Sequence, residues 1–186
     1  MTHFALAAPG HDTALPDTPA ALPRSSTVVR AFSHPAEVTA VHPVLVAAAK
    51  LAGEHWMRAE AHRLVRDPHA DDHVLASATR TIAARDTGCA VLAEHIDIWA
   101  ATVLAEPRNA MLHTETLGRL INRLCGVWTR WRLLADDAEA ADPGIALALH
   151  QLTELCHAYD DLITDLQSGR RHLPVYQAIT TPDAVA

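Results

Sequence analysis

Apolar residues recur at intervals of three and four positions along four long segments of this chain, the period of an α-helix with one buried face. In the first segment that face comprises Val44, Ala48, Leu51, Ala52, His55, Ala59 and His62. Pro43 suits a first helical turn, and Asp67-Pro68 interrupts the pattern. We therefore predict a helix from about residue 41 or 43 to residue 66.

The same spacing predicts three further helices. The second begins after an N-cap at Asp71 or Asp72 and continues to about residue 105. The third extends from about residue 114 or 116 to residue 135, and the fourth begins at Pro143 and ends before Gly169. Four amphipathic helices with short connections bury their apolar faces most simply as an up-down-up-down bundle.

The two ends of the chain lack this period. Residues 1–35 contain several prolines and show neither helical nor strand spacing, apart from a short helix expected after Pro35. We expect a flexible leader over residues 1–35, the helical bundle over residues 36–168 and a tail over residues 169–186. The predicted fold is all-α: an antiparallel up-down four-helix bundle with a disordered N-terminal leader and an irregular C-terminal tail.

Composition narrows the range of partners. The formal net charge of −7 argues against nucleic acid, which needs a basic surface. No apolar run is long enough to cross a bilayer, and no secretory signal is visible, so we expect no membrane partner. Three widely spaced cysteines, Cys89, Cys125 and Cys156, are typical of free thiols in a reducing compartment. A cytoplasmic location is expected.

Candidate chemistry lies where polar residues interrupt the apolar faces, at His55, His62 and Arg85. A polar group removed from water costs roughly 2–7 kcal/mol unless it finds a partner. The two histidines are two turns apart, about 10 Å along the axis, so they cannot bind one metal ion without help from other helices. They are either satisfied boundary residues or proton-transfer groups in a cavity.

Arg85 lies within the apolar seam of the second helix and therefore needs a carboxylate or an anionic ligand. An ion pair would explain it structurally, and an anchor for an anionic ligand would explain it functionally. The candidate partners are Glu60, Asp86, Asp97 and Glu115.

A Glu-x-x-His motif at Glu154 and His157 suggests a di-iron site, but such sites need a second copy of the motif, and this chain has none. At 100° per residue these side chains also lie on the solvent side of the fourth helix. We predict no metal site and no cofactor. A metal or haem held by His55, His62 or His95 stays open as an alternative.

Three segments resemble the domain-of-unknown-function 4254 family of bacterial proteins. Residues 55–67 (HWMRAEAHRLVRD) resemble its LWxxEDxxR-type segment, residues 113–124 (HTETLGRLINRL) resemble its TETPGxxxDRL-type segment, and residues 166–176 are similar to its ending. The resemblance covers roughly residues 41–180 and implies a helical fold, without indicating a reaction. The positions that match are Trp56, Glu60, Arg63, Arg85, Thr114, Glu115 and Arg123.

The chain departs from the family pattern at Ala59, Leu117 and Asn122, where the family has an acid, a proline and an aspartate. If those acids carry a family function, this member has either changed or lost it.

The leading hypothesis is a protein that binds a small anionic organic molecule in a pocket between helices. The proposed catalytic residues are His55, His62 and Glu60. The proposed ligand-binding residues are Arg63, Arg85, Glu115 and Trp128. If the protein is an enzyme, these groups suit cofactor-free acid–base chemistry by an isomerase, cyclase or lyase. The alternatives are a homo-oligomeric interaction or assembly module without catalysis, for instance a homodimer, and a His-ligated metal or haem enzyme.

Overall fold

The computed structural model describes residues 21–38, 42–104, 107, 109–137 and 143–174. Its elements are α1 (Ser25–Ser33), the 3-10 helix η1 (Pro35–Glu37), α2 (Pro43–Val65), α3 (Asp72–Val103), β1 (Met111–Leu112), α4 (Leu117–Asp137), α5 (Pro143–Gln167) and β2 (Arg171–His172). The long helices α2 to α5 coincide with the four predicted segments, so the all-α prediction is confirmed. None of the helices described is both long and apolar enough to cross a membrane.

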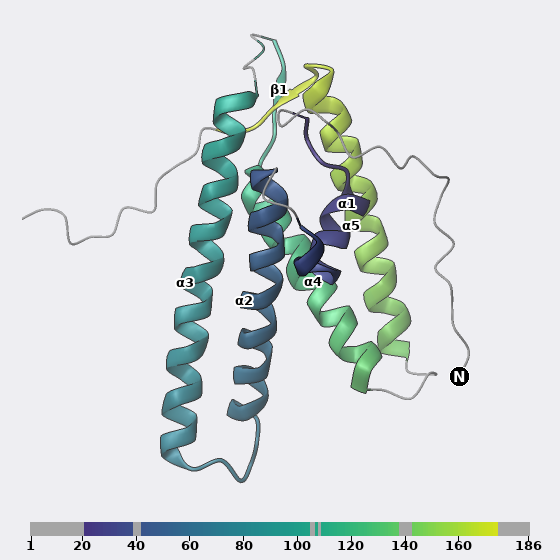
Figure 1. The fold of residues 1–186 in the computed structure, drawn as a ribbon. Helices are drawn as coiled ribbons and strands as arrows, with labels where there is room; N and C mark the ends of the chain where they lie inside the picture. Colours follow the sequence, from purple (N-terminus) through teal and green to yellow (C-terminus); the bar gives the residue numbers. More distant parts are fainter. Residues whose placement is uncertain (1–20, 39–41, 105–106, 108, 138–142, 175–186) are drawn as a thin grey trace, which may run out of the picture.

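Consecutive long helices run in opposite directions, and α2 and α3 form the most extensive pair (Figure 1). The turn between them ends at Asp71, whose side chain accepts a hydrogen bond from the Val74 N–H at 2.8 Å. This is the N-cap expected at that position, and it satisfies one of the free N–H groups of the first turn of α3.

The predicted antiparallel up-down four-helix bundle is not confirmed in the way the helices pack. Within the described residues, the backbone of α5 comes close to α4 and α1 but not to α2 or α3, whereas α1 comes close to α2, α4 and α5. The apolar face of α5 is therefore buried by α1 and α4 together. α1 contacts both α2 and α5, and its Val28 and Phe32 belong to the same buried cluster as residues of the long helices.

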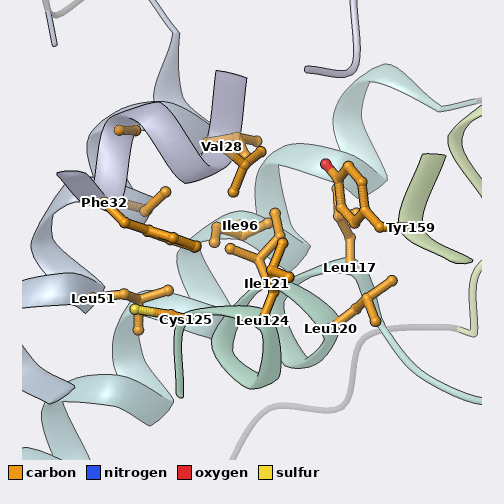
Figure 2. Packing of buried hydrophobic residues seen from close by; sticks show 14 of the residues in the cluster. Val28, Phe32, Leu51, Ile96, Leu117, Leu120, Ile121, Leu124, Cys125 and Tyr159 are labelled. Atoms are coloured by element: carbon orange, nitrogen blue, oxygen red, sulfur yellow. The ribbon is translucent and has the colours of Figure 1, made fainter. Parts of the chain in front are cut away.

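The prediction of a leader without helix up to residue 35 was wrong for residues 25–33, which form α1. Val28 and Phe32 of α1 are almost fully buried among side chains of α2, α3, α4 and α5 (Figure 2). Tyr159 of α5 donates a hydrogen bond to the Pro23 carbonyl at 2.9 Å, which holds the start of α1 in place. Residues 1–20 of the predicted leader lie outside the described residues.

Two short strands join distant parts of the chain. β1, between α3 and α4, pairs in parallel with β2, which follows α5; Met111 is opposite Arg171 and Leu112 is opposite His172. We predicted no strand, because two residues are too few to show the alternation that reveals one. The predicted tail is thus ordered at its start, and residues 175–186 lie outside the described residues.

Candidate functional site

An open groove of about 380 Å³ lies between α2 and α4. Figure 1 shows that α4 inclines away from α2 towards the C-terminal ends of both helices. The face of α2 that is buried as far as Ala52 therefore becomes a wall of the groove from His55 onwards. The lining consists of His55, Arg58, Ala59, His62, Arg66, Gly126, Thr129, Arg130, Leu133 and Leu134.

His55 occupies the narrow end of the groove. Its Nε2 lies 2.7 Å from Oδ1 of Asn122 on α4. Because an amide oxygen only accepts, Nε2 carries the proton of this hydrogen bond. The ring rests against Gly126, where an added Cβ would lie 3.2 Å from Cε1, so the glycine makes room for the imidazole.

Burial lowers the pKa of His55, and the positive charge of Arg58 lowers it further. The hydrogen bond to Asn122 and the charge of Asp86 act in the opposite direction without cancelling the effect of burial. His55 is therefore neutral at neutral pH, with Nε2 protonated and Nδ1 unprotonated.

The charged groups that line the groove are all basic, and no carboxylate is part of the lining. Arg58 forms an ion pair with Asp86 of α3, with Nε and Oδ1 2.6 Å apart. Arg66 and Arg130, one on each wall, form no ion pair with the described residues. Leu133, Leu134 and Ala59 add apolar surface, so the groove suits an anion with an apolar body.

Thr129 adds a buried polar group to the α4 wall. The residue is only 3% exposed, and its hydroxyl forms no hydrogen bond with the described residues apart from a weak interaction with the Cys125 thiol. The hydroxyl oxygen itself is buried, so this polar group is not presented to the groove.

Arg85 lies at a different interface, between α2 and α3. Its Nη1 is 3.3 Å from Glu54, whose carboxylate packs against Gly88. Both side chains are partly buried, at 32% and 20% exposure. The expectation that Arg85 needs a carboxylate is confirmed, but none of the four candidate partners was correct.

The other predicted site residues are dispersed. Glu60 pairs with Arg63 on the exposed surface of α2, at 3.1 Å, and neither lines the groove. Glu115 pairs with Arg123 at the start of α4, at 2.9 Å. Trp128 is buried in the core, with its ring centroid 5.6 Å from that of Phe32. Of the seven predicted site residues, the structure brings His55 and His62 together in the groove.

Asp97, one of the four candidate partners of Arg85, instead anchors α4 to α3. Its carboxylate accepts a hydrogen bond from the Gly118 N–H at 2.6 Å, in the first turn of α4. Burial raises the pKa of Asp97, against this hydrogen bond and the charge of Arg119. A Cβ at Gly118 would overlap the carbonyl of Ala93, so the two helices approach each other directly at this point.

Residues of the types that bind metal ions do not form a cluster in the described part of the structure. Within the described part of the chain, no three His, Cys, Asp or Glu side chains are close enough together to hold one. Glu154 and His157 are exposed, as their position on the helix predicted.

Arg58, Arg66 and Arg130 line the groove but were not among the predicted site residues. The first two lie three and eleven positions after His55, and therefore on nearly the same side of α2, so helical spacing could have found them. No comparable signal pairs this side of α2 with α4, because that contact depends on the angle between the helices.

A family model described as "Protein of unknown function (DUF4254)" matches residues 47–175. The protein belongs to this family. The DUF4254 match confirms the resemblance seen in the three segments, and it includes both walls of the groove while leaving α1 outside. No curated protein and no solved structure matches the chain.

Proposed function

We propose that this protein binds a small anionic organic molecule in the α2–α4 groove. The observation that carries the proposal is the lining, which combines arginines and imidazoles from two helices and contains no carboxylate. Arg66 and Arg130 would bind the anionic group from opposite walls, since a guanidinium matches the oxygens of a carboxylate or phosphate. Leu133 and Leu134 would contact the organic part of the ligand.

Isothermal titration with citrate and with a sugar phosphate tests the proposal. A hydrogen bond to a charged group contributes about 1.5–3 kcal/mol, so R66Q or R130Q should weaken binding roughly tenfold or more. R63Q and R132Q are matched controls, because those arginines already pair with Glu60 and Asp136 and do not line the groove. Equal losses in the controls, or no binding by the unmodified protein, would contradict the proposal.

Binding is better supported than catalysis. Glu60 is one of the three proposed catalytic residues, but it pairs with Arg63 and does not line the groove. If the groove does host an isomerase, cyclase or lyase reaction, His55 is the residue placed to transfer the proton, because its Nδ1 carries a free electron pair.

One observation favours the homodimer as a second candidate. Trp56, Met57 and Leu64 of α2 are 39%, 43% and 47% exposed, so this helix presents large apolar side chains to solvent that a second copy could cover. Light scattering of the purified protein would test this candidate. A dimer that W56S converts to a monomer would support an assembly role, and a monomer at all concentrations would exclude it.

A further inference from the structure

The direction of the His55 hydrogen bond determines what the ring can offer to the groove. Asn122 Oδ1 accepts from Nε2, so that nitrogen keeps its proton whether the ring is neutral or charged. The backbone carbonyl of Asn122 also acts on the ring, but no hydrogen bond of Nδ1 to a described residue has ordinary geometry, and Nδ1 is not among the buried polar atoms that lack a partner. Any proton that His55 gains is therefore added at Nδ1, on an atom that solvent or a ligand can reach.

The charges around His55 favour an anion at this position. On α2 the neighbouring titratable or charged groups are Arg58 and His62, and from α4 the groove receives Arg130. The acidic neighbour is Asp86 of α3, which is already paired with Arg58. An anion in the groove would thus face basic groups, with one nearby carboxylate neutralised by its own partner.

We propose that the α2–α4 groove binds a dianion together with one proton, which His55 takes up from solvent on Nδ1. The inference rests on the proposed function and specifies its ligand as a doubly charged oxyanion, such as a phosphate monoester. Two unpaired guanidiniums on opposite walls match the several oxygens of such a group. No bond of the ligand breaks in this step.

The sign of the coupling follows from linkage. Burial keeps free His55 neutral, whereas a dianion near Nδ1 stabilises the imidazolium and raises the pKa of the ring in the complex. At pH values between the pKa of His55 in the free protein and its pKa in the complex, binding must then take up a proton. The affinity for the dianion must fall as the pH rises through this range. With one proton involved, the dissociation constant rises at most about tenfold per pH unit.

Sulfate is a suitable probe because it stays a dianion near neutral pH. The full chain is titrated calorimetrically with sulfate at about pH 6 and about pH 8, in two buffers of different ionisation enthalpy. We expect weaker binding at the higher pH and uptake of up to one proton. H55Q, which keeps an N–H donor for Asn122, should bind sulfate without proton uptake. H150Q, which changes an exposed histidine of α5 outside the groove, should retain the uptake.

The outcomes separate the two proposals. Sulfate binding with equal affinity at both pH values and no proton uptake overturns the role of His55 and leaves the anion groove intact. Loss of proton uptake in H150Q but not in H55Q also overturns it. Absence of sulfate binding at both pH values refutes the groove itself. If H55Q fails to fold, the imidazole ¹⁵N resonances of the unmodified protein decide, since sulfate must shift Nδ1 of His55 towards its protonated value.

Discussion

Replacing Gly118 with alanine tests the packing of α4 against α3. The added Cβ would lie 2.6 Å from the carbonyl carbon of Ala93, which is backbone and cannot rotate away. The start of α4 must then shift, which weakens the 2.6 Å hydrogen bond between the Gly118 N–H and Asp97. Both effects lower the free energy of unfolding.

The magnitude follows from three contributions. Overpacking of a tight contact costs about 1–3 kcal/mol, and loss of a buried hydrogen bond to a charged group costs about 1.5–3 kcal/mol. The higher helix propensity of alanine returns up to about 1 kcal/mol. We therefore expect G118A to be roughly 2–5 kcal/mol less stable than the unmodified protein in urea unfolding followed by far-ultraviolet circular dichroism.

Gly53 supplies the matched control. It is exposed in the middle of α2, and a Cβ there would meet no atom within 4 Å. G53A should gain about 0.5–1 kcal/mol from helix propensity alone. If G118A also gains stability, the close approach of α3 and α4 is not present in solution, and the reasoning fails.

Two further predictions concern titration. Since burial raises the folded-state pKa of Asp97, the folded protein binds a proton more tightly there than the unfolded chain, and stability is lost as the pH rises from about 4 through the folded pKa. The free energy of unfolding of D97N, measured in urea at several pH values, should not show this loss. N122D should place a carboxylate about 2.7 Å from Nε2 of His55 and raise the pKa of His55 by about 1–3, measured by NMR titration; an unchanged pKa would contradict the hydrogen bond.

The long helices were predictable because each repeats its apolar spacing over many turns. The bounds of α2 and α5 also follow from local signals, Pro43 at the start of one and Gly169 after the other. α1 was missed because nine residues give little periodic signal, and the prolines before it favoured an irregular leader. Its helical state depends on the burial of Val28 and Phe32 by residues far along the chain.

The sequence indicated which polar residues of the candidate site interrupt an apolar face. It did not indicate which residues on other helices they contact. His55 and His62 stood out because they interrupt an apolar face. Glu54, the partner of Arg85, lies 31 positions earlier in the sequence, and only the packing of α2 on α3 places it there. The arginines of the groove lie beside the apolar face, where a solvent-exposed role is the ordinary interpretation.

The helix α1 shows that the folding unit is larger than the segment shared with the family. The family match begins at residue 47, inside α2, whereas the core includes residues from 22 onwards. A chain that began at residue 47 would lack Phe32, which packs beside Trp128. It would also lack Val28, which lies in the core beside α4 and α5. Removing these side chains would open cavities that each cost several kcal/mol, about 2–5 for a large side chain. Anyone who expresses this protein for study should therefore retain the residues from about Leu22 onwards, even though family membership does not require them.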